Sequence, residues 1–170
     1  LISLVNDIIK LSELDEGGAK SDETKSVDLA EVSSEVAKRL TPVAAKKGVV
    51  INTEGEKAEI TAGESLVFEM IYNLCDNAVK YNKENGTVTV TTGISGGASF
   101  VSVKDTGIGI PSECTDRIFE RFYRVDKSRS KESGGTGLGL SIVKHIAMSL
   151  GGEITVDSTP GVGTNITVVF

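Results

Sequence analysis

Two amides, an ammonium group and a phenol recur at helical spacing in one stretch of this 170-residue sequence. Their offsets of 0, 4, 7 and 8 place them on one face of a helix: Asn73, Asn77, Lys80 and Tyr81. The amide oxygen of Asn77 is a hard ligand suited to Mg²⁺, Lys80 could face phosphate groups, and Tyr81 could lie against a base. For this segment alone, an ordinary solvated helix face is an equally good interpretation.

A carboxylate followed by two glycines makes a second candidate. Asp105 ends a predicted strand, and Gly107 and Gly109 let the chain turn sharply without side chains that would block a cavity. A carboxylate there can accept a hydrogen bond from an exocyclic amine, which adenine presents where guanine presents an oxygen. When such a segment stands alone, it more often forms an ordinary turn between two strands than a binding site.

A third segment, residues 135–140, has the sequence GTGLGL and opens a predicted helix. Free backbone amides and the helix dipole favour phosphate at such an end. The segment lacks the Gly-Lys-Ser/Thr ending of a P-loop, and it follows a charged loop rather than a strand, which excludes the dinucleotide-binding context. Each of the three segments is weak alone, but in this order they predict a nucleotide pocket.

Basic residues gather just before the third segment. Six of them stand against two acidic residues between positions 117 and 131, a local excess of +4 in a chain of net charge -6. This excess suits a small polyanion, although a solvated loop is the more common explanation of a charge run. The basic residues are Arg117, Arg121, Arg124, Lys127, Arg129 and Lys131.

The overall composition limits the class of protein. The net charge of -6 and the pI near 4.9 argue against nucleic-acid binding, which favours a basic face. With 39% hydrophobic and 25% charged residues the chain is predicted to be globular. No apolar run approaches the roughly 18 residues of a spanning helix, so membrane insertion is not expected. Cys75 and Cys114 lack metal-site spacing, which favours a reduced, cytoplasmic setting, with Cys75 packed in a core.

The hydrophobic pattern predicts an α/β (α+β) two-layer sandwich, with one mixed sheet covered on one face by three helices. The predicted helices are residues 28–46, with Asp28 as N-cap, 64–81 and 138–150. The predicted strands are residues 49–53, 58–61, 87–92, 100–105, 153–157 and 165–170.

A separate helical seam lies at the start of the sequence, formed by Leu1, Leu4, Ile8 and Leu11. An acidic, glycine-containing stretch follows it and indicates a linker. The predicted division is a helix from another unit over residues 1–16, a linker over 17–26, and the compact domain over 27–170.

The order of these segments resembles the ATP-binding catalytic domain of bacterial sensor histidine kinases. The resemblance combines segments 73–81, 105–109 and 135–140 with the sequence FERFYR at residues 119–124. Four motifs in the right order and spacing make it specific over residues 27–170. It implies a Bergerat-type sandwich, as in the gyrase and heat-shock chaperone ATPases, with a lid over residues 110–136. Residues 1–16 look like the end of the second helix of the dimerisation and phosphoacceptor hairpin.

The resemblance also implies roles for individual residues. Asn77 would hold Mg²⁺, while Asn73 and Lys80 would face the phosphates. Tyr81 would lie beside the base, and Asp105 would bind the adenine amine. Arg124 is the candidate that swings onto the γ-phosphate and stabilises phosphoryl transfer. The full set expected to bind ATP or ADP is Asn73, Asn77, Lys80, Tyr81, Asp105, Gly107, Gly109, Ile110, Tyr123, Arg124, Gly135, Thr136, Gly137, Leu138, Gly139, Leu140 and Thr164.

One position of the first segment bears on hydrolysis. Asn73 stands where the resembled ATPases carry a glutamate that orients water, and an amide cannot act as a general base, so hydrolysis should be slow. Glu69 lies one turn earlier on the same helical face. The predicted catalytic residues are therefore Glu69, Asn77, Lys80 and Arg124.

His145 is the single histidine of the sequence, and it lacks the acidic residue and proline that follow a phosphoacceptor histidine in this family. It is predicted to be a surface or partly packed helix residue. The expected activity is transfer of the γ-phosphoryl of Mg·ATP to a histidine on a hairpin domain that is missing here. A response regulator is the expected further partner. The full-length protein is expected to be a homodimeric, membrane-anchored kinase with this domain in the cytoplasm.

Two alternatives stay open. The first is a nucleotide-gated interaction module that binds ATP but transfers nothing. The second is an anti-sigma-type serine kinase of the same fold, which the FERFYR sequence and the helix at residues 1–16 make less favoured.

Overall fold

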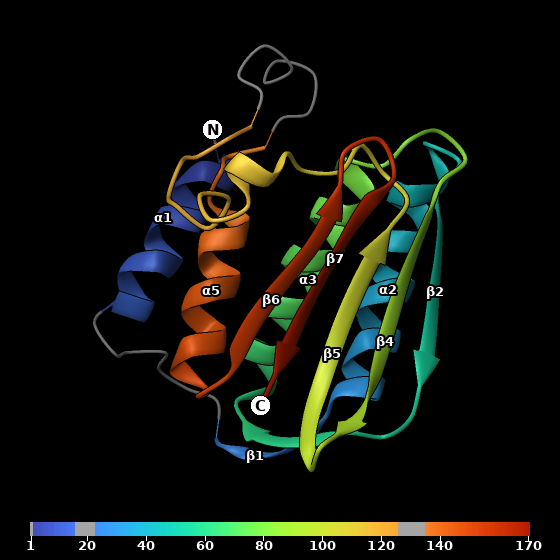
Figure 1. Cartoon of the computed structure of the whole chain (residues 1–170). Helices are drawn as coiled ribbons and strands as arrows, with labels where there is room; N and C mark the ends of the chain where they lie inside the picture. Colours follow the sequence, from blue (N-terminus) through green and yellow to red (C-terminus); the bar gives the residue numbers. More distant parts are fainter. Residues whose placement is uncertain (1, 16–22, 126–134) are drawn as a thin grey trace.

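The computed structural model of the chain describes residues 2–15, 23–125 and 135–170. Its centre is a five-stranded sheet of order β2-β4-β5-β7-β6, in which β2 and β4 are parallel and the other neighbours antiparallel. The strands are β2 (Val50–Gly55), β4 (Thr87–Ser95), β5 (Ala98–Asp105), β6 (Glu153–Thr159) and β7 (Gly163–Val169). One face of the sheet is covered by α2 (Leu29–Ala45), α3 (Glu64–Lys80) and α5 (Gly139–Ser149) (Figure 1). The predicted two-layer α/β sandwich is confirmed.

Local capping explains where the helices begin and end. Asp28 caps α2 as predicted, because its side chain accepts a hydrogen bond from the Ala30 backbone N at 2.9 Å. Helix α3 ends at Lys80, and Tyr81 follows as its C-cap. After α5, Gly151 takes a φ of +72°, the left-handed conformation that commonly ends helices. The apolar faces of the three helices then pack into one core with the inner face of the sheet.

One strand lies outside the main sheet, contrary to the prediction of a single sheet. Strand β3 (Glu59–Ala62) pairs antiparallel with β1 (Lys25–Asp28), and the two form a separate ribbon. The sequence did not predict β1, which spans the boundary drawn between residues 26 and 27. Four residues with Val27 as their one buried side chain give no periodic signal, so only the pairing with β3 defines this strand.

Helix α1 (Ile2–Asp15) lies beside α5 (Figure 1). Its predicted apolar seam is only partly buried. Leu11 is buried in the core and Leu4 packs against it, whereas the side chain of Ile8 is 46% exposed. Leu1 lies outside the described residues. A search of the described helices finds none that combines the length and the apolar character needed to cross a bilayer.

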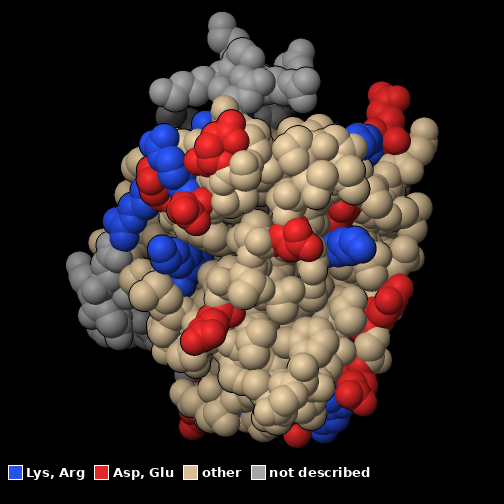
Figure 2. Space-filling model, in the orientation of Figure 1, with Lys and Arg blue, Asp and Glu red and all other residues tan. Residues whose placement is uncertain are grey.

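The outer face of the sheet carries few charged side chains. Figure 2 shows a largely uncharged surface, with acidic and basic groups near its middle and more of them toward its margins. Hydroxyl and amide groups bond to each other along this face. The Ser102 hydroxyl donates to Asn165 Oδ1 at 2.7 Å and lies 2.9 Å from the Thr167 hydroxyl. The helices leave this face open (Figure 1).

Candidate functional site

A cavity of about 470 Å³ lies between α3, the adjoining ends of β5 and β7, and the segment of residues 108–125. Four buried side chains form what we call its floor: Leu74, Ala78, Val103 and Ile166. We call residues 108–125 its roof. Ten of the predicted site residues line the cavity: Asn77, Lys80, Tyr81, Asp105, Gly109, Ile110, Tyr123, Arg124, Leu140 and Thr164. The fold thus brings groups from five separate parts of the sequence to one hollow.

Asp105 is the acidic group in the lining of this cavity. Its Oδ1 accepts hydrogen bonds from the backbone N of Gly107 at 2.7 Å and of Thr164 at 3.3 Å. Burial raises the pKa of the Asp105 carboxyl above its ordinary value, and these two backbone hydrogen bonds oppose the shift. Both bonds end on Oδ1, so Oδ2 is the oxygen left to accept from a ligand. The raised pKa marks the carboxyl as a functional candidate.

Two glycines after Asp105 are required by close backbone packing. A Cβ on Gly107 would lie 2.3 Å from the carbonyl oxygen of Tyr81, and one on Gly109 would lie 2.2 Å from that of Thr159. Gly109 also has a φ of +69°, which side chains rarely adopt. The segment is tied to α3 by the backbone N of Ile108, which donates to the Tyr81 carbonyl at 3.1 Å. A side chain at Gly107 would push this segment away from Tyr81, and one at Gly109 would push it away from Thr159.

The polar face of α3 is divided between the cavity and α1. Lys80 lines the cavity and pairs its Nζ with Asp76 Oδ2 at 2.5 Å. Asn73 donates from Nδ2 to the Glu69 carbonyl at 2.9 Å. The Glu69 carboxylate pairs with Lys10 Nζ on α1 at 2.6 Å, and neither Asn73 nor Glu69 belongs to the cavity lining. The predicted stripe is therefore one face of one helix, but only its C-terminal half lines the cavity.

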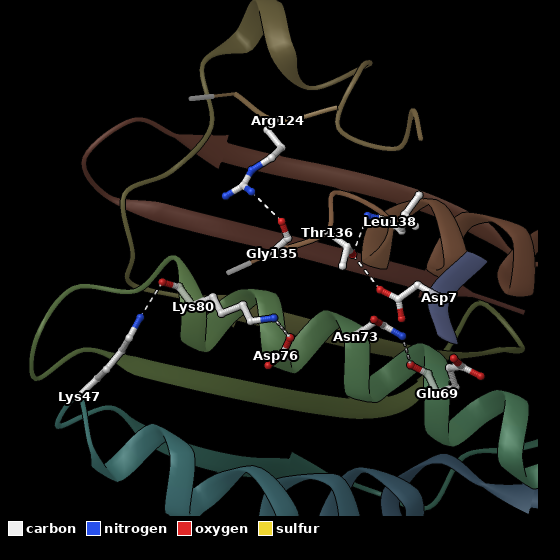
Figure 3. A network of polar contacts seen from close by, with 10 residues as sticks. All are labelled: Asp7, Lys47, Glu69, Asn73, Asp76, Lys80, Arg124, Gly135, Thr136 and Leu138. Atoms are coloured by element: carbon white, nitrogen blue, oxygen red, sulfur yellow. Dashed lines mark hydrogen bonds and ion pairs between the residues drawn. The ribbon is translucent and has the colours of Figure 1, made fainter. Parts of the chain in front are cut away.

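The glycine segment of residues 135–139 runs along the rim of the cavity. Arg124 Nη1 donates to the Gly135 carbonyl at 2.6 Å, and Phe122 N donates to the Gly137 carbonyl at 2.9 Å. A Cβ on Gly139 would lie 3.0 Å from Asn73 Oδ1. Leu140 is the only residue of the GTGLGL sequence among those lining the cavity. The segment therefore adjoins α3 and the roof, as Figure 3 shows for Gly135, Thr136 and Leu138.

The roof carries the described half of the predicted basic run. Arg117 pairs with Glu120 at 3.3 Å and stacks over the Tyr123 ring with 4.4 Å to its centroid. Arg124 lines the cavity. Lys127, Arg129, Lys131 and the corresponding part of the predicted lid lie outside the described residues. The roof therefore presents one guanidinium, that of Arg124, to the cavity from the described part of the run.

Sequence reasoning missed nine lining residues: the four floor side chains and Lys47, Asn82, Ile108, Ile118 and Val125. Asn82 and Ile108 directly adjoin predicted positions, so a wider reading of those two segments would have included them. Lys47 offered no such signal. It follows α2 in the sequence, and its Nζ reaches across to donate to the Lys80 carbonyl at 2.9 Å.

The structure also locates Cys75, His145 and the candidate metal ligand Asn77. Cys75 is fully buried on α3, and burial raises its pKa to about 12, which fits a packing role. His145 is half-buried on α5 and does not line the cavity. Within the described ranges no group of three or more His, Cys, Asp or Glu could hold a metal ion. Asn77 in the cavity lining remains the candidate metal ligand.

Sequence comparison places the chain among known proteins. Residues 62–170 match the family described as histidine kinase-, DNA gyrase B-, and HSP90-like ATPase. The chain is 37% identical to the sensor histidine kinase YkoH of Bacillus subtilis over 98% of its own length and 36% of that protein. It is 36% identical to the sensor-like histidine kinase SenX3 of Mycolicibacterium smegmatis over 99% of its length and 44% of that protein. The chain thus spans less than half the length of these relatives.

Solved structures agree with these matches. The full-length structure of ShkA in complex with AMPPNP superimposes with a TM-score of 0.83 at 33% identity, over 99% of this chain and 35% of that one. The mycobacterial sensor histidine kinase MprB gives a TM-score of 0.75 at 27% identity, over 87% and 97% of the two chains. The chain therefore belongs to the histidine kinase-, DNA gyrase B-, and HSP90-like ATPase family, as the nucleotide-binding domain found in sensor histidine kinases.

Proposed function

We propose that this domain binds Mg·ATP in the cavity between α3 and the roof, and that it delivers the γ-phosphoryl group to a histidine on a helical hairpin of the full-length protein. The observation that carries the proposal is Asp105, a half-buried carboxylate with Oδ2 left to accept, in a cavity that also holds Asn77, Lys80 and Arg124. A hydrogen-bond acceptor and cationic groups in one cavity match the adenine base and the phosphates of ATP.

At the base end, Asp105 accepts from the exocyclic amine of adenine. Guanine presents an oxygen in the same place, and two acceptors facing each other would leave a buried carboxylate unpaired. The apolar floor packs against the base. Tyr81, Ile110 and Thr164 border the same end, together with Gly109, whose missing side chain keeps the base close to the backbone.

At the phosphate end, the side chains of α3 supply the charge and the metal ligand. Asn77 would hold Mg²⁺, which accepts few protein oxygens and takes the rest from phosphate and water. Bound there, the ion neutralises charge on the phosphates during transfer. Lys80 leaves its pair with Asp76 to meet the phosphates, and Arg124 adds positive charge from the roof. Asn73 and residues 135–139 complete this end, because Gly139 lies against Asn73.

Two side chains bear on the choice between transfer and hydrolysis. Asn73 cannot take a proton from water, so the bound nucleotide is protected from wasteful hydrolysis. The catalytic role predicted for Glu69 requires its ion pair with Lys10 to open, because that pair holds the carboxylate outside the cavity lining. Asn77, Lys80 and Arg124 are the catalytic residues that the cavity supports best.

The acceptor is a histidine other than His145. That side chain is half-buried on α5, outside the cavity lining. A response regulator is the proposed recipient of the phosphoryl group from the hairpin. The proposed full-length protein is a membrane-anchored homodimer with this domain in the cytoplasm.

Calorimetric titration with ATP and GTP, each with and without Mg²⁺, tests the pocket. The wild type should prefer ATP and bind it more tightly with Mg²⁺. Asp105→Asn should lose roughly tenfold or more in ATP affinity, because a hydrogen bond to a charged group contributes about 1.5–3 kcal/mol. Equal affinity for GTP and ATP would contradict the role of Asp105.

Transfer is tested separately with γ-labelled ATP and the hairpin domain of a close relative supplied as a second chain. Label on the hairpin histidine supports the proposed kinase. Binding of ATP without any label on the hairpin would favour a nucleotide-gated interaction module. Label on a serine would favour a serine kinase.

A further inference from the structure

Helix α1 reaches the candidate site through two polar contacts. Asp7 Oδ2 accepts from the Thr136 hydroxyl at 2.8 Å, and Lys10 Nζ pairs with Glu69 Oε1 at 2.6 Å. Asp7 and Lys10 lie three residues apart, so they share one face of the helix. Figure 3 shows Asp7 pointing from α1 toward Thr136, close to the polar face of α3.

Thr136 lies between Gly135 and Gly137 in the glycine segment. Its neighbour Gly135 adjoins the cavity, since a Cβ there would lie 3.7 Å from the Tyr81 hydroxyl and 3.9 Å from Arg124 Nη2. On its other side, the backbone N of Leu138 donates to the Thr136 hydroxyl oxygen at 3.3 Å. A hydroxyl has one proton to donate. In this structure Thr136 gives that proton to Asp7, so the hydroxyl cannot donate to a phosphate at the same time.

Asp7 also brings a negative charge to this rim. The ion pairs formed among the described residues involve Lys10, Lys80 and other groups, but not Asp7. A carboxylate one hydrogen bond away from a phosphate-binding segment opposes phosphate, and the opposition grows with the number of phosphate charges. The contact is therefore unfavourable for a polyphosphate and neutral for an uncharged ligand.

We propose that Asp7 is a positioning residue of the nucleotide site, through which α1 and the phosphates of the nucleotide compete for the Thr136 hydroxyl. The proposal rests on the proposed function, because it assumes that phosphates reach residues 135–139. By linkage the competition works in both directions. Docked α1 weakens the binding of polyphosphate nucleotides, and a bound polyphosphate nucleotide releases α1 from Thr136.

Affinities of ATP, ADP and AMP, measured by calorimetry on the full chain, test the first direction. Asp7→Asn keeps the size of the side chain and an oxygen for Thr136 but removes the charge. It should tighten ATP binding roughly fivefold, the lower end of typical coupling between sites. It should tighten ADP binding less and AMP binding least. Glu35→Gln, an exposed change on α2 with the same effect on net charge, should leave the three affinities as in the wild type.

A purely structural role of Asp7 would change the three affinities by the same factor, and that result would overturn the inference. Weaker ATP binding in Asp7→Asn would overturn it as well. Failure of the wild type to bind ATP would instead remove the proposed function and the inference together, so the two failures are distinguishable.

Hydrogen exchange tests the reverse direction without any substitution. Saturating ATP should lower the protection of the backbone amides of α1 in the wild type, while AMP should leave it unchanged. Equal or greater protection of α1 with ATP would contradict the proposed competition.

Discussion

The floor and the roof of the cavity are built in different ways. The floor residues are buried, and Val103 and Ile166 are register partners in the ladder between β5 and β7. The roof relies on short-range backbone bonds, such as Arg117 N to Cys114 O at 2.9 Å, and leaves Phe122 59% exposed. The floor is thus stabilised by the whole core, whereas the roof combines its own turns with hydrogen bonds to neighbouring segments, such as Phe122 N to the Gly137 carbonyl at 2.9 Å. We expect the floor to keep its shape without nucleotide and the roof to respond to it.

The largest expected difference between the two regions is the reactivity of their cysteines. Cys75 lies behind the floor with a pKa of about 12, whereas Cys114 is half-buried in the roof. A thiol must be both exposed and deprotonated to react. At pH 8, iodoacetamide should therefore modify Cys114 roughly a thousandfold or more faster than Cys75, because the Cys75 thiol becomes accessible only when the protein unfolds.

Mass spectrometry of the alkylated protein measures both rates. In a denaturing concentration of urea the two cysteines should react at similar rates. Fast modification of Cys75 under native conditions would show that the core behind the floor opens locally, and the contrast with the roof would fail.

The next largest expected difference is in the free energy of unfolding, after truncation of one large side chain to alanine in the floor or in the roof. Leu74→Ala removes a floor side chain that is 2% exposed, and it should lower the free energy of unfolding by about 2–5 kcal/mol. Phe122→Ala in the roof should change it by no more than about 0.5 kcal/mol. Urea denaturation followed by circular dichroism measures both values. Similar losses for the two variants would mean that the roof is as integral to the core as the floor.

The same contrast explains what the sequence could predict. The elements that hold the floor and Asp105 follow from local patterns, because the apolar face of α3 repeats at helical spacing and Asp105 ends a strand before two glycines, but the sequence did not predict that the floor side chains line the cavity. These signals need no knowledge of distant contacts. The motifs of the roof were recognised by resemblance, but the orientations of their side chains were not predictable. Arg117 pairs with Glu120 and stacks on Tyr123, while Arg124 turns to the cavity.

Long-range contacts account for most of what sequence reasoning missed. Lys47 reaches the Lys80 carbonyl across 33 residues, and Thr136 meets Asp7 across 129. Strand β1 exists because β3 pairs with it. None of these leaves a periodic trace, because one partner is a single polar residue or a strand of four residues. The three-dimensional arrangement is needed to find them.

The pH dependence of ATP binding sharpens the role of Asp105, which lines the same cavity as the floor. Asp105 must be ionised to accept a hydrogen bond from adenine without a competing proton, and burial raises its pKa. ATP affinity should therefore fall as the pH falls through that raised value, by roughly tenfold at the limit. Asp105→Asn should show a flatter profile over the same window. Calorimetry from pH 7 downward measures this, and parallel profiles for the two proteins would contradict the assignment.

The smallest expected effect is on stability, and its sign follows from the same carboxyl. Because the pKa of Asp105 is raised in the folded state, its contribution to stability is fully present below the ordinary pKa of an aspartate. The contribution is lost as the pH rises through the folded value. Asn at this position has no charge to lose and keeps an oxygen for Gly107 and Thr164. Relative to wild type, Asp105→Asn should therefore gain stability between acidic and neutral pH and then level off. Unfolding free energies of both proteins across that window measure the gain. A constant difference would mean that folding does not bury the Asp105 charge.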